Sequence, residues 1–73
     1  MDNIKEQIVN VAKLFVEDQS WPWIEPVDVQ LQPMPSGEKA WSVRTNVYAR
    51  GRNVRLLIRE SDFSVIESAY LPR

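Results

Sequence analysis

The sequence of 73 residues lacks both cysteine and histidine, and it contains only two glycines. Without cysteine the chain has no disulfide and no thiolate ligand, and without histidine it lacks the commonest metal ligand and general base of proteins. No segment approaches the roughly 18 consecutive apolar residues of a membrane-spanning helix. We therefore expect no metal, no cofactor and no membrane partner, and we expect packing to hold the fold together.

A secretory signal is also missing from the first residues. The segment MDNIKEQIVNVAKLFV carries acids and lysines within an amphipathic pattern, without an uninterrupted apolar region or a small-residue cleavage site. We therefore expect a cytoplasmic location.

The length and composition indicate one small folded domain covering residues 1–73. A chain of this size buries only about 60% of the surface that it exposes when unfolded, so its core must be small. Hydrophobic residues make up 44% of the chain and charged residues 26%, which is typical of globular proteins. The net charge of −1 is unevenly distributed, because residues 1–38 carry a net −5 and residues 39–73 a net +4.

The N-terminal segment has apolar residues at the i, i+4, i+7, i+11 spacing of one helical face. Asp2 or Asn3 is placed to cap the first turn. Pro22 pushes the residue before it out of the α region, so the helix should end between Glu17 and Ser20. The residues of the apolar stripe are Ile4, Ile8, Val11 and Phe15.

Four further apolar residues widen this stripe to roughly 220° when each residue turns by about 100°, which is more than one sheet face covers. We expect either the segment SWPWIEP (residues 20–26) or another chain to cover the edge of the helix. Since this segment links the helix to the first strand, we expect Trp23 or Ile24 at the edge of the core and Trp21 exposed. The four widening residues are Val9, Ala12, Leu14 and Val16.

After Pro26 the apolar period changes to two, which is typical of half-buried strands. A first strand is expected over Val27–Gln32, and the breaker-rich segment Pro33–Lys39 predicts a turn. A second strand follows from Trp41 to Tyr48. Its inner face is expected to hold Trp41, Val43, Thr45 and Val47, and its outer face Ser42, Arg44, Asn46 and Tyr48.

The remaining residues predict two more strands. ARGRN (residues 49–53) reads as a hairpin tip, followed by a third strand over Val54–Ile58. Glu60–Ser64 is a tight connection, and Val65–Leu71 is a last strand that Pro72 ends. Short links favour an antiparallel meander, and the helix is the only apolar layer available to cover it.

The expected fold is therefore α+β with two layers, in which one N-terminal helix packs on a four-stranded antiparallel meander sheet. The expected inner face consists of Ile4, Ile8, Val11, Phe15, Val29, Leu31, Trp41, Val43, Val54, Leu56 and Ile58.

This element order, with a tryptophan opening the second strand in AWSVRTNV and a last hairpin in VRLLIRESDFSVIESAYL, resembles the small cystatin-like and PepSY-like modules, including compact bacterial immunity proteins. The similarity covers nearly the whole chain in element order. It implies an α+β fold and a role in binding or inhibiting another protein, and no catalytic residues come with it.

Residues suited to catalysis are sparse. Without histidine, a serine nucleophile would require a lysine base, and none of Lys5, Lys13 and Lys39 stands in a context that would desolvate it. The acids are scattered, and the chain has no glycine-rich phosphate-binding motif. We therefore expect that the protein is not an enzyme.

Arginines are concentrated in the second half of the chain. Two flank Gly51 at the expected hairpin tip, and three share the expected outer face with Tyr48. Arginines beside an aromatic ring suit phosphates and stacked bases, so nucleic-acid binding is one hypothesis. Against it, exterior arginines also pair with acids such as Glu67, and the isoelectric point of about 5.3 is far below that of a typical nucleic-acid-binding domain. The residues of this alternative are Arg44, Arg50, Arg52, Arg55 and Arg59.

The outer face also holds apolar residues, because the same alternation places Leu57, Ile66 and Tyr70 beside these arginines. Tyrosine and arginine around an apolar centre are enriched at protein interfaces. We therefore expect a protein-interaction module that binds a partner, or a second copy of itself, through the outer sheet face or a sheet edge. A second alternative is a small-ligand carrier with a pocket between helix and sheet near the tryptophans. The expected contact residues are Arg44, Tyr48, Arg55, Leu57, Arg59, Tyr70 and Trp21.

Overall fold

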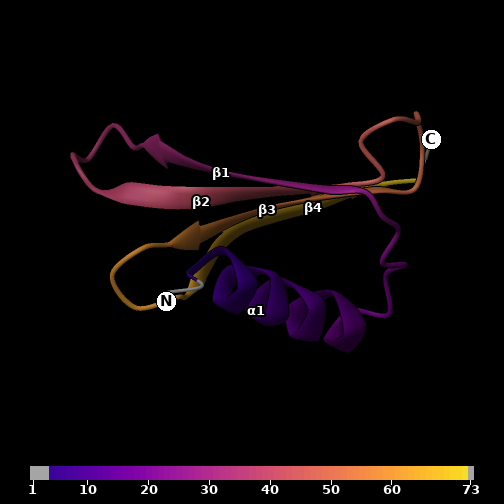
Figure 1. Cartoon of the computed structure of the whole chain (residues 1–73), viewed down its shortest axis with the longest axis horizontal. Helices are drawn as coiled ribbons and strands as arrows, with labels where there is room; N and C mark the ends of the chain where they lie inside the picture. The colour runs from indigo at the N-terminus through magenta and orange to yellow at the C-terminus, as the bar shows by residue number, and fades with distance from the viewer. Residues whose placement is uncertain (1–3, 73) are drawn as a thin grey trace.

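A computed structural model describes residues 4–72, in which one helix is followed by four antiparallel strands (Figure 1). The strands form one sheet in the order β1-β2-β3-β4, and the helix lies on one side of it. The predicted two-layer α+β meander is therefore confirmed, whereas the capping role predicted for Asp2 or Asn3 lies outside the described residues. The elements are α1 (Ile4–Asp18), β1 (Val27–Pro33), β2 (Lys39–Thr45), β3 (Asn53–Arg59) and β4 (Val65–Leu71).

Helix α1 ends where the sequence predicts, and it ends in a complete Schellman motif. Ser20 adopts the left-handed conformation with φ of 63°. Its N–H donates to the carbonyl oxygen of Glu17, and the N–H of Trp21 donates to that of Val16, both at 3.0 Å. These bonds satisfy carbonyls that a helix end would otherwise leave unpaired. Neither the length nor the polarity of α1 suits a membrane crossing, and residues 4–72 contain no other helix.

The core lies between α1 and the two central strands, because α1 packs over β2 and β3. The edge strand β1 is less well covered, and Leu31, although it faces the helix side opposite Trp41, is 40% exposed. Most of the predicted inner face is confirmed, including Thr45 of the second strand, and Ala12, Val16 and Ala40 are buried in addition. The buried apolar residues are Ile8, Ala12, Val16, Ala40, Trp41, Val43, Val54, Leu56 and Ile58.

Strand β2 stops at Thr45, three residues earlier than expected. Asn46 turns into the left-handed region with φ of 53°, and its N–H donates to the carbonyl oxygen of Ile24 at 2.8 Å instead of continuing the ladder. Val47 was expected on the inner face and Tyr48 on the outer face of the strand. Both instead lie in a loop of residues 46–52, where their exposed fractions are 37% and 89%.

The link between α1 and β1 places both of its tryptophans against the core. The prediction for Trp23 is thus confirmed, but the prediction that Trp21 is exposed is wrong. The ring of Trp21 is half-buried, lies edge-on to Phe15 at 6.1 Å between centroids, and stacks on Tyr70 at 5.8 Å. The prediction that Tyr70 lies on the outer face is also wrong, because Tyr70 is paired with Val54 and packs on the helix side of the sheet.

The error at Tyr70 has its cause in a β-bulge. Leu57 is paired with Glu67, and the next residue of β3, Ile58, is paired with Val65, so Ile66 is an extra residue in β4. A bulge interrupts the strict alternation of faces. Alternation counted along the strand through Ile66 therefore assigns Tyr70 to the wrong side.

Candidate functional site

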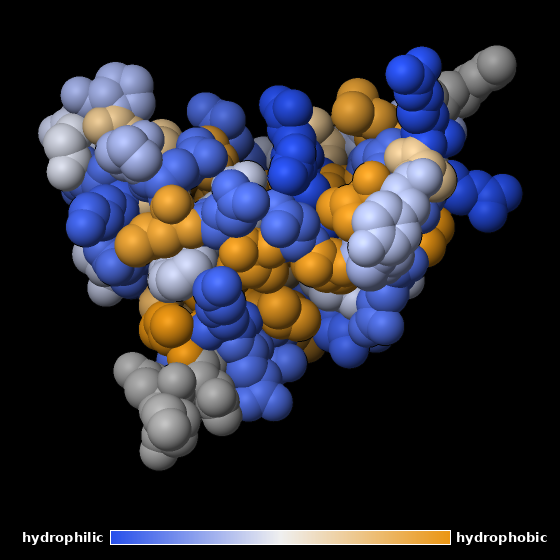
Figure 2. Space-filling model, turned by 45° about the horizontal axis from the view of Figure 1, so that its top comes forward, coloured by the Kyte–Doolittle hydropathy of each residue, from blue (hydrophilic) through white to orange (hydrophobic). Residues whose placement is uncertain are grey.

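The side of the sheet opposite α1 has no covering layer in residues 4–72 (Figure 1). One row of paired residues crosses all four strands on this side, and it consists of Asp28, Arg44, Arg55 and Ala69. Figure 2 shows apolar atoms reaching the surface in separate patches divided by hydrophilic side chains. We call this side the outer face, and its principal residues are Asp28, Gln30, Gln32, Ser42, Arg44, Arg55, Leu57, Arg59, Glu67 and Ala69.

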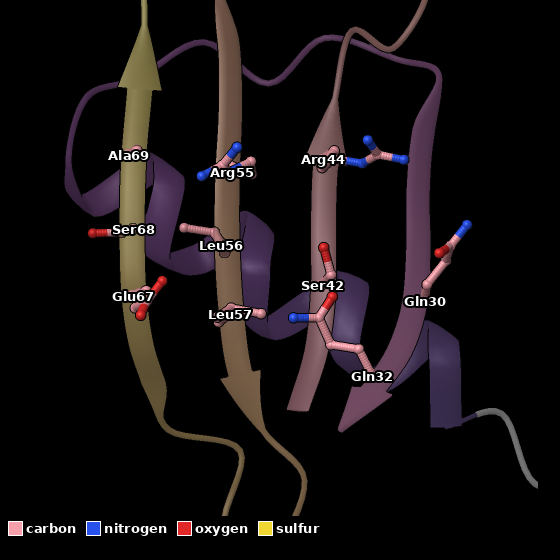
Figure 3. A pocket seen from close by; sticks show the side chains of 10 residues that line it. All are labelled: Gln30, Gln32, Ser42, Arg44, Arg55, Leu56, Leu57, Glu67, Ser68 and Ala69. Carbon is pink, nitrogen blue, oxygen red and sulfur yellow. The ribbon is translucent and has the colours of Figure 1, made fainter. Parts of the chain in front are cut away.

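The centre of the outer face is a shallow groove lined mostly by polar residues, and Leu57 is the large apolar side chain of the outer face within it. Leu57 is half-buried and stands in one row with Ser42 on β2 and Glu67 on β4. The groove has a volume of about 410 Å³, and Gln30 and Gln32 of β1 form its far wall (Figure 3). An apolar side chain within a ring of hydrogen-bonding groups is the general composition of a protein contact surface.

Two arginines lie directly opposite each other on the central strands of this face. Arg44 and Arg55 are paired in the register of β2 and β3, and like charges in such positions are destabilising. The guanidinium of Arg44 turns away toward β1, where its Nη2 lies 2.9 Å from Oδ2 of Asp28 (Figure 3). Arg55 forms no ion pair with any residue in the range 4–72. One positive charge of the pair is therefore left without compensation.

Arg59 lies at the opposite end of the outer face and is compensated. Its guanidinium is 3.6 Å from the carboxylate of Glu38 and 3.3 Å from that of Asp62. Asp62 is held by the neighbouring turn, since Oδ1 accepts the Ser64 hydroxyl at 2.7 Å and the Ser64 N–H at 3.1 Å. These hydrogen bonds, assisted by Arg59, lower the pKa of Asp62. Arg59 is thus part of a local ion network and about 13 Å along β3 from Arg55.

The 46–52 loop extends the outer face at the end where Arg44 and Arg55 lie. The side chain of Asn53 braces the loop, because its amide donates to the carbonyl oxygens of Thr45, Asn46 and Ala49 at 2.9–3.2 Å. Its Oδ1 accepts the N–H of Gly51 at 2.7 Å. The loop is therefore fixed by specific bonds, and it carries the exposed side chains of Tyr48, Arg50 and Arg52.

The structure thus separates the predicted contact residues into three groups. Arg44, Arg55, Leu57 and Arg59 share the outer face as predicted, and Tyr48 lies on the loop beside it. Tyr70 and Trp21 lie on the helix side. The arginines of the nucleic-acid alternative do not form one continuous track, because Arg59 is paired with acids at the far end.

Sequence reasoning also missed residues of the groove, namely the glutamines of β1. The alternation in VDVQLQ already places Gln30 and Gln32 on the face opposite the apolar side chains, so this signal was present in the sequence.

The small-ligand alternative places a pocket between helix and sheet near the tryptophans. The hollow beside Trp21 and Trp23 is instead lined by residues of α1 and the link, and none of its lining comes from the sheet.

The described part of the chain brings together no group of three or more acidic side chains that could hold a metal ion. Comparisons with protein-family models, curated proteins and solved structures found no match to the chain. The order of one helix followed by four antiparallel strands is therefore the part of the sequence resemblance that the structure shows.

Proposed function

We propose that the protein is a non-enzymatic protein-binding module whose contact surface is the outer face of the sheet. The observation that carries this proposal is Arg55, which lies beside Leu57 on a sheet face that no layer of residues 4–72 covers and has no ion pair within that range. Arginine provides several hydrogen-bond donors in a planar fork and is enriched at the centre of protein interfaces. A partner that carries a carboxylate would relieve the repulsion between Arg55 and Arg44.

The resemblance in element order supports the same proposal. Cystatin-like and PepSY-like modules generally bind or inhibit another protein, and they combine one helix with an antiparallel meander. An inhibitory, immunity or regulatory role is accordingly the form of binding that we propose.

A matched pair of variants tests the contact surface. Leu57→Lys places a charge in the centre of the outer face, and Leu14→Lys makes the same change on α1, where Leu14 is already 68% exposed. Each protein is immobilised, incubated with nuclease-treated lysate of its source, and the captured proteins are identified by mass spectrometry. Both variants are first checked for folding by circular dichroism and urea unfolding.

We expect the wild type and Leu14→Lys to capture the same specific protein, and Leu57→Lys to lose it. Equal capture by all three proteins would contradict the proposal. A parallel incubation uses untreated lysate, and capture from untreated but not from nuclease-treated lysate would favour the nucleic-acid alternative, because phosphate contacts supply most of that binding.

Self-association is the alternative use of the same face, and the molecular mass in solution distinguishes it. A mass near twice the 8.5 kDa of the chain, reduced to one chain by Leu57→Lys, would identify a second copy as the partner. A strict monomer at high concentration would exclude this alternative.

A further inference from the structure

A second hollow opens where the outer face meets the 46–52 loop. Its volume is about 630 Å³, and its walls combine cationic and apolar side chains. Arg44 comes from β2, Arg55 from β3 and Arg50 from the loop, so arginines of three separate segments border the hollow. We call this feature the arginine hollow. The residues that line it include Arg44, Arg50, Arg55, Val47, Ala49 and Leu71.

The charge of the arginine hollow is only partly compensated within the chain. Arg44 shares its charge with Asp28, but neither Arg50 nor Arg55 takes part in an ion pair within residues 4–72. The opposed positions of Arg44 and Arg55 make this arrangement unfavourable for an empty surface. An anionic group placed between the arginines would convert that repulsion into charge-assisted hydrogen bonds.

The apolar walls restrict which anion fits. Val47 is 37% exposed and Leu71 is 48% exposed, so two of the five most exposed large apolar side chains of residues 4–72 border the same hollow. A bare phosphate or a polyphosphate backbone would leave these side chains in water. An occupant that carries an apolar side chain next to its anionic group would cover them.

The hollow is also built before any ligand arrives, because the loop that forms one wall is fixed. Besides the bonds of Asn53, the amide of Asn46 donates to the carbonyl oxygen of Gly51 at 3.0 Å. The N–H of Val47 donates to the carbonyl oxygen of Pro26 at 3.3 Å, which ties the loop to the link after α1. Binding therefore costs less conformational entropy than binding to a mobile loop would, and this favours affinity.

We infer that the arginine hollow binds an acidic segment of the partner protein in which carboxylate side chains flank an apolar one. This inference rests on the proposed function and gives the partner's contact a chemical class. A polyanion such as nucleic acid suits the hollow less well, because Asp28 and Glu67 lie on the same face and the loop residues Tyr48 and Arg52 lie outside its lining. The partner's carboxylates engage Arg50 and Arg55, and its apolar side chain covers Val47 and Leu71.

Fluorescence anisotropy with defined peptides tests the inference. The probe is a labelled peptide Glu-Leu-Glu-Leu-Glu with a blocked C-terminus, titrated with the full chain at low salt. Two control peptides separate the contributions: Gln-Leu-Gln-Leu-Gln lacks the charges, and Glu-Ser-Glu-Ser-Glu lacks the apolar side chains. We expect the first peptide to bind most tightly, and to bind less tightly as salt is raised.

Variants of the protein locate the binding. We expect Arg50→Gln and Arg55→Gln each to weaken binding roughly tenfold, because each removes charge-assisted hydrogen bonds. Arg52→Gln is the matched control, since Arg52 lies on the same loop but outside the lining, and Arg59→Gln removes a charge at the far end of the face. Both controls should change affinity less than twofold.

Several outcomes would overturn the inference. These are the absence of binding by the wild type, an equal loss in Arg52→Gln and Arg55→Gln, equal affinity for the serine peptide, or tighter binding of an oligothymidine of the same charge. All variants are compared only if their urea midpoints match the wild type. Failure here leaves the proposed function open, because that proposal depends on capture by the Leu57→Lys and Leu14→Lys pair and not on the peptide.

Discussion

The side chain of Asn53 makes more hydrogen bonds to the 46–52 loop than any other side chain, and replacing Asn53 by alanine should show how far the loop depends on them. The Asn53 side chain makes four hydrogen bonds, of which three share the two hydrogens of its amide group. We count these four as about three hydrogen bonds at about 1 kcal/mol each, so Asn53→Ala should lower the free energy of unfolding by about 3 kcal/mol. Gly51 is buried, so the loss of the acceptor for its N–H adds to this cost unless water enters the loop.

This loss is large for so small a domain. At roughly 4–8 °C per kcal/mol for a chain of this size, the melting temperature should fall by about 12 °C or more. Urea unfolding monitored by tryptophan fluorescence measures the free energy of unfolding. Amide hydrogen exchange at Gly51 and Ala49 reports the order of the loop.

The control is Asn10→Ala, which makes the same change on the exposed side of α1. The side chain of Asn10 forms no hydrogen bond with the described residues, and alanine is the better helix former, so this variant should be neutral or slightly more stable. A loss below about 1 kcal/mol in Asn53→Ala, with slow exchange retained at Gly51, would refute the bracing role of Asn53.

Three further predictions concern other parts of the fold. Ser20→Gly should raise the free energy of unfolding by roughly 0.5–1 kcal/mol, because glycine adopts the left-handed conformation of Ser20 without strain, and a lower urea midpoint would contradict this. Ser64→Ala should raise the pKa of Asp62 toward its ordinary value, because the hydroxyl donor is lost. Since a lowered pKa gives stability that is present above it and lost as the pH falls through it, this variant should lose less stability in acid, and carboxyl carbon NMR titration with acid unfolding checks both statements. Tyr70→Ala should cost about 2 kcal/mol through the loss of stacking on Trp21, whereas Tyr70→Phe should cost little, and urea unfolding of the pair decides between ring packing and the hydroxyl.

The sequence predicts the elements of this fold well, because each depends on local spacing. The helical stripe from Ile4 to Phe15 and the alternation in the strands differ in period, so helix and strands are readily distinguished. The meander order follows from the short links, which allow few other arrangements. The same alternation correctly places Arg44, Arg55 and Leu57 on one face.

The wrong predictions arise where a single residue interrupts the alternation of a strand, or where residues far apart in the sequence come into contact. The left-handed Asn46 ends β2 early and moves Tyr48 from a strand to a loop, and no spacing rule reveals this. The bulge at Ile66 reverses the face assigned to Tyr70. The burial of Trp21 depends on Tyr70, a residue at the other end of the chain, and so cannot be read from the link alone.

The candidate site shows the same division. Its residue types were visible in the sequence, but the opposition of Arg44 and Arg55 depends on the register of β2 and β3. That register depends on the length and bonding of the 46–52 loop. The arginine hollow therefore required the three-dimensional arrangement, because its walls come from β2, the 46–52 loop, β3 and β4, which no motif connects.

The position of Leu71 in the wall of the arginine hollow affects how the protein should be handled in the laboratory. Strand β4 ends at the side of the molecule where the 46–52 loop lies, whereas α1 begins at the opposite side (Figure 1). A purification tag or a fluorescent protein fused after Pro72 would start beside the hollow and compete with any ligand. Tethering the protein through the end that precedes α1 keeps this surface accessible for capture and peptide titration.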